Sequence, residues 1–376
     1  MRKVYKGLCV PVLLFFAVLL SAAKPADTPS RLVDKNSGEA ITLASITDRN
    51  GTMIAQTGND GSIPEIQATA FPVTFSLIGY EPLEVDSLGG GDIALEPLTL
   101  QLSEVVVSPG EAPLMYITAY MREYASSFGS KDSLTIYEEG IVDFLIPVEK
   151  TKVKGWRKPR ILASKQYQRH TDSAGLDEVS NQADDIYLIA SNLNIFPSSE
   201  GSALSMPEKI ASASGTTTET VFTKNNTKMD WQRNGNIIRL SHDIMTRYEN
   251  HVYSPTAFKL LGATVDITES VGSYVFICGD GERTITPADL CQLSLSLKLI
   301  GRGKMFKWGF DSKSPVDIRN YIEIYVIDRA YVTEKEGKEL KKNPPSVPAG
   351  IVAPKGTAPL HPGVERIVER VNGKVR

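Results

Sequence analysis

Short runs of alternating apolar and polar residues, separated by turn-forming residues, dominate the first third of the chain. Residues 41–47 and 71–78 are typical strands. Between them, Asn-Gly at 50–51 and Gly-Asn-Asp-Gly at 58–61 are typical hairpin turns. The run at 102–107 closes this part, directly before the breaker Ser-Pro-Gly. Strands of roughly six residues at this spacing predict an all-β sandwich over residues 24–107.

The apolar period changes after this module. Leu114, Ile117, Met121, Tyr124 and Phe128 follow one another at spacings of three and four, and Gly129 comes next. This period is typical of an amphipathic helix ended by glycine. Residues 108–130 are therefore predicted to be a short linker and one helix.

Residues 131–343 return to strand patterns. Leu293, Leu295, Leu297 and Leu299 alternate with other residues, which indicates a sheet with one covered face. Helices are predicted only at 241–250 and 333–342, and 191–215 is predicted to be a long surface loop. The predicted strands cover residues 134–147, 161–169, 186–189, 220–222, 236–240, 264–268, 274–277, 293–300, 304–310 and 321–332. The fold class is thus mainly β, a small sandwich followed by a larger, mostly antiparallel β domain with a few helices.

The two ends of the chain have their own patterns. Arg2, Lys3 and Lys6 precede an apolar run at 8–20 and the small residues Ser-Ala-Ala at 21–23, which is typical of a secretory signal peptide cleaved after residue 23. An uncleaved anchor is the alternative, although the run is shorter than the roughly 20 residues that span a bilayer. We expect export to the periplasm or the outer-membrane surface, with no transmembrane span after cleavage. The Pro-rich tail, 344–376, is predicted to be disordered.

Charge is unevenly distributed along the chain. The formal net charge of −3 becomes −6 once the three cationic residues of the leader are removed. Residues 24–107 hold 12 acidic and 4 basic residues. Such a chain is not a nucleic-acid binder.

Four short motifs in the first module resemble a known family. They are Val-Asp-Lys-Asn-Ser-Gly-Glu at 33–39, Thr-Gly-Asn-Asp-Gly at 57–61, Phe-Ser-Leu-Ile-Gly-Tyr-Glu at 75–81 and Leu-Ser-Glu-Val-Val-Val at 102–107. In this order they resemble the carboxypeptidase regulatory-like domain. The resemblance implies a transthyretin-like, seven-strand Greek-key sandwich of the kind common in cell-envelope proteins of Bacteroidota. That module accompanies enzymes but carries no catalysis, so the name transfers no activity. Tyr80 is interpreted as a packed ring with its hydroxyl near solvent, and a ligand role is the alternative.

Catalytic motifs are not found. His170, His242, His251 and His361 do not form a zinc-hydrolase pattern. The chain has neither a Gly-x-Ser-x-Gly elbow nor a phosphate-binding loop. The acid pairs Asp184–Asp185 and Asp280–Glu282 are interpreted as solvated turn residues, with glycoside hydrolysis as the alternative. No enzyme activity, cofactor or metal is predicted.

Two groups of residues remain as candidates. In an exported protein the pair Cys278 and Cys291 favours a disulfide, and two buried free thiols are the alternative. The second group holds eight cationic residues in 20 without one acid, and Gly155 and Pro159 suggest a hairpin tip. Such a cluster is either a solvated hairpin or a contact surface for the acidic module, an anionic glycan or lipid headgroups. Its residues are Lys150, Lys152, Lys154, Trp156, Arg157, Lys158, Arg160, Lys165, Tyr167 and Arg169.

These patterns predict an exported, non-enzymatic accessory or binding protein of the cell envelope. An envelope hydrolase with an unfamiliar site and a component associated with outer-membrane transport are the alternatives.

Overall fold

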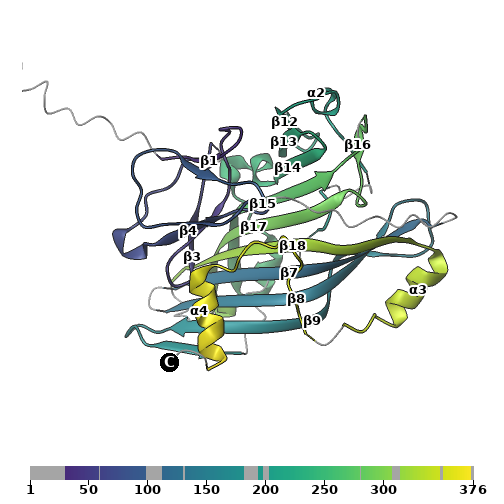
Figure 1. Cartoon of the computed structure of the whole chain (residues 1–376). Helices are drawn as coiled ribbons and strands as arrows, with labels where there is room; N and C mark the ends of the chain where they lie inside the picture. Colours follow the sequence, from purple (N-terminus) through teal and green to yellow (C-terminus); the bar gives the residue numbers. More distant parts are fainter. Residues whose placement is uncertain are drawn as a thin grey trace, which may run out of the picture.

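The protein is mainly β, as predicted. Small N-terminal sheets come first in the chain, and one large antiparallel sheet follows (Figure 1). A computed structural model describes residues 30–58, 60–98, 112–129, 132–181, 194–197, 203–279, 281–306, 314–347 and 350–373. The predicted signal peptide, the predicted strand at 102–107 and the acids Asp184, Asp185 and Asp280 lie outside these residues.

The N-terminal module is built from two small sheets that share one core. Strands β3, β2, β4 and β5 form an antiparallel sheet in that order, while β1 and β6 pair in parallel. Leu32 and Leu95 from the parallel pair and Ile46 and Phe75 from the larger sheet are fully buried in the same cluster. The elements are β1 (Leu32–Asp34), β2 (Ser45–Thr47), β3 (Met53–Gln56), a 3-10 turn (Ala68–Ala70), β4 (Val73–Ser76), β5 (Leu83–Val85) and β6 (Ile93–Leu95).

The second part of the chain forms a ten-stranded sheet in the order β10-β9-β8-β7-β18-β17-β15-β14-β13-β12, and every pairing is antiparallel. The alternation at 293–299 lies in β17, as predicted. The strands are β7 (Leu114–Phe128), β8 (Ser133–Pro147), β9 (Trp156–Thr171), β10 (Asp177–Ser180), β12 (Thr217–Phe222), β13 (Lys228–Asn234), β14 (Ile237–Asp243), β15 (Ala263–Ile277), β17 (Leu290–Gly303) and β18 (Val316–Val332).

The predicted helix at 114–128 is wrong, because these residues form β7 near the middle of the sheet. No residue of this strand is exposed. One face, with Met115, Ile117 and Met121, enters the main core, while Tyr120 and Tyr124 of the other face lie in separate clusters. Burial on both faces removes the alternation by which strands are recognised, and the remaining apolar spacing imitates a helix.

Other local predictions are partly correct. Helix α3 (Glu334–Lys342) lies where a helix was expected and begins at a capping box formed by Thr333 and Glu336. The helix predicted at 241–250 is wrong, since β14 continues to Asp243 and short 3-10 turns follow. The predicted loop at 191–215 contains the short strand β11 (Leu204–Ser205) and the one-turn helix α2 (Glu208–Ala211), and β11 pairs with β16 (Thr284–Ile285). Within the described parts of the chain, no helix is long and apolar enough to cross a membrane.

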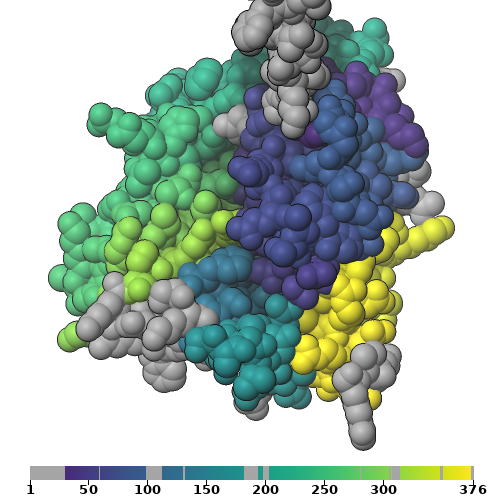
Figure 2. Space-filling view, turned by 90° about the vertical axis from the view of Figure 1, so that its left-hand side faces the viewer, coloured from purple at the N-terminus to yellow at the C-terminus, as the bar shows by residue number. Residues whose placement is uncertain are grey.

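The predicted disorder of the C-terminal tail is wrong for its described residues. Helix α4 (Pro362–Val371) buries Val364 and Ile367 in a cluster with Met53 and with tyrosines of the sheet. Figure 2 shows this yellow segment directly beside the purple and blue N-terminal module. The prediction of disorder rested on the proline content of the tail. The periodic apolar residues of 364–371 instead give the helix one apolar face, and the N-terminal module and the large sheet together cover that face.

The N-terminal module is bonded to one face of the sheet. Thr52 Oγ1 lies 3.3 Å from Thr135 Oγ1, and the backbone N–H of Met53 donates to Ser126 Oγ at 3.1 Å. Farther along, Ile78 packs against Tyr120 and Val275. These contacts hold the module over the sheet and leave an open space at one side of the junction.

Candidate binding cleft

A cleft of about 620 Å³ lies between the N-terminal module and strands β12 to β15. The module contributes Asp34, Ile41 and Tyr80 to its wall, and the sheet contributes Arg239 and Val275 among others. Clefts of this size between structural units are common sites for small ligands. It is therefore the candidate binding site.

Tyr80 and Asp34 form the wall on the module side. The Tyr80 hydroxyl donates to Asp34 Oδ2 at 2.9 Å, and Asp34 Oδ1 also accepts from the backbone N–H groups of Asn36 and Ser37. Tyr80 is almost fully buried, and this burial raises the pKa of its phenol well above the usual range. The phenol is thus a neutral, fixed donor. Its ring is packed, as predicted, but its hydroxyl bonds Asp34 within the module instead of lying near solvent.

Arg239, Ser241 and Ser273 form a polar patch on the opposite wall. Ser241 pairs with Ser273 across β14 and β15, and Arg239 lies two residues before Ser241, so all three side chains share one face. The Arg239 guanidinium lies over the Tyr80 ring, 5.2 Å from its centroid. Its Nε is buried without a hydrogen-bond partner, and Arg239 forms no ion pair with any described residue.

Several other polar groups that line the cleft already have partners. Lys228 Nζ lies 2.8 Å from Asp230 Oδ2, and Asp230 Oδ1 accepts from Thr220 at 2.6 Å. The Gln232 amide donates to Glu39 at 2.7 Å, which joins the sheet to the module. The cleft therefore offers a ligand the Arg239 guanidinium and two serine hydroxyls beside an aromatic ring. Glu219 Oε2 and the Trp231 indole N–H, at the same wall, are also without a hydrogen-bond partner. A guanidinium with neighbouring hydroxyl donors suits a carboxylate or a similar planar anion.

The predicted cationic cluster is only partly available to a partner. Arg160 forms an ion pair with the fully buried Asp143, and the Trp156 indole donates to Asp143 Oδ1 at 3.0 Å. Arg169 donates to the backbone oxygen of Asn50 at 2.8 Å. Arg160 and Trp156 are therefore structural, because the buried Asp143 carboxylate needs a charged partner. Arg169 joins the sheet to the N-terminal module.

The lysines of the cluster remain at the surface. Lys150, Lys152, Lys154, Lys158 and Lys165 are exposed, as the solvated interpretation requires. The predicted tip is correct for Gly155 but not for Pro159, which lies inside β9 next to an irregularity in its pairing with β8. A Cβ atom on Gly155 would lie 2.0 Å from the Leu145 backbone oxygen, so this glycine permits a close approach of two chain segments.

Both cysteines are buried free thiols in the structure, so the predicted disulfide between Cys278 and Cys291 is not formed there. Cys278 follows β15 and Cys291 lies in β17, and these two strands are neighbours in the sheet. Burial raises the pKa of both thiols, that of Cys278 to about 12. The structure therefore agrees with the alternative, two buried free thiols.

Sequence reasoning missed Arg239, Ser241 and Ser273. Their positions in the chain follow no recognisable motif, and β13, which supplies part of the wall, was not among the predicted strands. Tyr80 was singled out, but the residue that covers its ring lies 159 positions farther along the chain. Only the docking of the module on the sheet brings these groups together.

Comparisons with known proteins identify no family. No family model matches the chain, and no curated protein matches it. Among solved structures, lipovitellin matches 59% of this chain and 26% of its own, at 10% identity and a TM-score of 0.21. The LG1-3 region of the laminin alpha2 chain matches 58% of this chain and 63% of its own, at 8% identity and a TM-score of 0.08. This chain therefore spans about a quarter of lipovitellin, and neither similarity bears on function.

Proposed function

We propose that this chain is an exported, non-enzymatic binding protein of the cell envelope, whose first module is a carboxypeptidase regulatory-like domain and whose cleft binds an anionic glycan. The observation that carries the proposal is the unpaired Arg239 guanidinium, which lies against Tyr80 inside a 620 Å³ cleft. The wall also carries acids, but Asp34 accepts from Tyr80 and Glu39 accepts from Gln232, and no ion pair joins Arg239 to any described acid. An anionic ligand would supply the partner that this guanidinium lacks.

The composition of the wall supports a sugar ligand. Serine and threonine hydroxyls from Ser241, Ser273 and Thr42 are spread around an apolar floor that includes Ile78 and Val275. Sugars offer the same mixture of hydroxyl groups and apolar C–H faces, and an acidic sugar adds the carboxylate that an arginine prefers.

Calorimetric titration with an oligogalacturonate, against a neutral oligogalactoside, tests the proposal. We expect the acidic oligosaccharide to bind and the neutral one to bind at least tenfold more weakly. Arg239→Gln should weaken binding of the acidic sugar by about 10- to 100-fold, since a hydrogen bond to a charged group contributes about 1.5–3 kcal/mol. Arg302→Gln is the matched control, because Arg302 is half exposed and pairs with Asp266 away from the cleft.

Equal binding by wild type and Arg239→Gln would place the glycan elsewhere, with the exposed lysines of 150–158 as the next site to change. Cleavage of the oligosaccharide during the titration would instead support the hydrolase alternative.

A further inference from the structure

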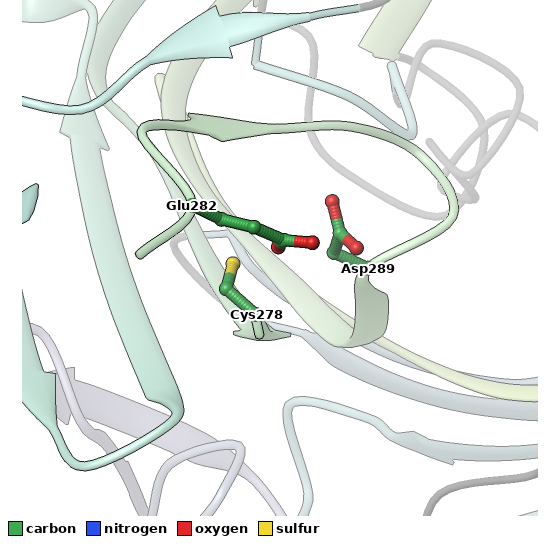
Figure 3. A group of neighbouring side chains, drawn as sticks. All are labelled: Cys278, Glu282 and Asp289. Carbon is green, nitrogen blue, oxygen red and sulfur yellow. The ribbon is translucent and has the colours of Figure 1, made fainter. Parts of the chain in front are cut away.

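Three side chains with metal-binding atoms converge at the end of the sheet, beyond the cleft and unrelated to it. They are Cys278, which follows β15, Glu282 in the connection, and Asp289, which precedes β17. Their sulfur and oxygen atoms all lie within 4.8 Å of one another. Figure 3 shows the thiol and the two carboxylates pointing toward one another from this single loop.

Each carboxylate is held by the loop through one oxygen. Glu282 Oε2 accepts from the Gly279 backbone N–H at 3.0 Å. Asp289 Oδ2 accepts from the N–H and the hydroxyl of Thr286 at 2.7 and 2.8 Å. The second oxygen of each group, Oε1 of Glu282 and Oδ1 of Asp289, carries no hydrogen bond from the described residues. In metal sites, hydrogen bonds from surrounding groups typically orient each carboxylate ligand through one oxygen and leave its other oxygen free to bind the ion.

The thiol is the second and independent indication. Cys278 is only 1% exposed and borders the main apolar core, and its sulfur has no hydrogen-bond partner among the described residues, yet the thiol lies beside two carboxylates. Two carboxylates beside a buried thiol are unfavourable neighbours unless a cation lies between them.

The nearby guanidinium groups are committed to other acceptors. Arg329 donates to the backbone oxygens of Ala288 and Leu290, and Arg233 donates to those of Gly235, Ile210 and Ala211. Among the described residues, neither arginine forms an ion pair with Glu282 or Asp289. These two carboxylates therefore have no cationic side chain bonded directly to them.

We infer that Cys278, Glu282 and Asp289 form a binding site for a divalent transition-metal ion of the zinc class. A thiolate with two carboxylates suits zinc, whereas calcium and magnesium prefer oxygen ligands alone. Three protein ligands leave the fourth tetrahedral position to water, and the exposed Glu282 keeps that side open to solvent. This site follows no known metal-binding sequence motif, because none of its three residues is a histidine.

Metal binding requires a small closure and the release of one proton. Ligand atoms around tetrahedral zinc, at about 2.0–2.3 Å from the ion, are roughly 3.3–3.8 Å apart. Because the three atoms already lie within 4.8 Å of one another, a closure of at most roughly 1–1.5 Å reaches this spacing, and Glu282, whose side chain is exposed, is free to move. The thiol proton passes to solvent as the sulfur–metal bond forms, so the ion replaces the proton on Cys278.

Cobalt substitution in the purified full chain tests the site. We expect one Co²⁺ per chain and a thiolate-to-cobalt charge-transfer band, which Zn²⁺ should abolish by competition. Glu282→Gln changes an exposed side chain and should not affect folding. It should weaken Co²⁺ binding by at least about tenfold, because even the loss of a group that only hydrogen-bonds to a metal ligand weakens metal binding by that much. Cys278→Ser should remove the charge-transfer band, and Cys291→Ser, the matched control, should keep it.

A band that survives in Cys278→Ser would overturn the proposal, as would Co²⁺ binding that Glu282→Gln leaves unchanged. Mass spectrometry without reduction adds an independent test. A linked Cys278–Cys291 peptide pair in protein from the envelope would mean that the thiol is in a disulfide and is not a metal ligand.

Discussion

His361 Nδ1 lies 2.8 Å from Thr47 Oγ1, so a residue of the C-terminal tail is bonded to a strand of the first module. The imidazole is 3% exposed and stacks on Tyr124 of β7, with ring centroids 5.3 Å apart. Beside it, Arg122 donates to the Ala358 backbone oxygen at 2.7 Å. The tail thus connects the module and the sheet, and its contribution to stability can be measured.

The first prediction concerns acid stability. Burial, followed by the neighbouring Arg122, lowers the pKa of His361 from 6.5 to about 4. Between these values the unfolded chain binds a proton that the folded chain does not, so the stability present above pH 6.5 is lost as the pH falls toward 4. The largest loss from this group is about 3 kcal/mol. Urea unfolding between pH 7 and 4 measures it.

Other acid groups titrate in the same range, so the difference between variants isolates the histidine. His361→Gln should be less stable at pH 7 but should lose less stability on acidification than wild type. His251→Asn is the control, because His251 is exposed and asparagine tolerates its positive φ of 54°. Parallel pH curves for wild type and His361→Gln would contradict the prediction.

The second prediction concerns the close approach of Gly363 in the tail to Gly51 in the module. A Cβ atom on Gly363 would lie 1.9 Å from the Gly51 nitrogen, so Gly363→Ala must push α4 away from the module. We expect a loss of about 1–3 kcal/mol, the usual cost of overpacking. Gly89→Ala is the matched control because nothing lies within 4 Å of its added carbon. Equal denaturant midpoints for the two variants would mean that the tail does not dock this way.

The third prediction separates the two kinds of cation in the 150–169 cluster. Arg160→Gln leaves the fully buried Asp143 carboxylate without its guanidinium partner and should cost about 3 kcal/mol. The triple variant Lys150→Gln, Lys152→Gln, Lys154→Gln should have the same melting temperature as the wild type, since exposed charges contribute little to folding. Thermal melts of both proteins test this. A triple variant that melts early would mean that the lysines are structural.

The fourth prediction concerns the cleft wall. Tyr80→Phe removes the donor to Asp34 but keeps the ring beneath Arg239. We expect a loss of about 1 kcal/mol, the net contribution of one hydrogen bond. Tyr253→Phe, at a tyrosine that is 40% exposed, should be neutral in the same urea titration. A loss several times larger for Tyr80→Phe would mean that Asp34 depends on this hydroxyl for its burial.

The sequence by itself determined the fold class and many of the strands. The alternation of Leu293, Leu295, Leu297 and Leu299 predicted the strand β17 correctly. The predicted covered face is not the leucine side alone, because Ser294 and Ser296 are buried while Leu295, Leu297 and Leu299 are only partly buried. The turn-forming residues of 34–61 likewise indicated the short strands of the first module. In both places the pattern that indicates the strand is local and can be read from neighbouring residues.

The tertiary structure alone decided the rest. Strand β7 is buried on both faces, so its residues carry no alternation from which a strand could be predicted. Helix α4 is ordered by contacts with residues about 240 to 310 positions earlier, among them Tyr124 and Met53. The partners of Tyr80 and Cys278 are likewise defined by docking and by loop closure. Periodicity records the environment of a single segment, whereas burial on both faces and contacts between distant segments exist only once the chain has packed.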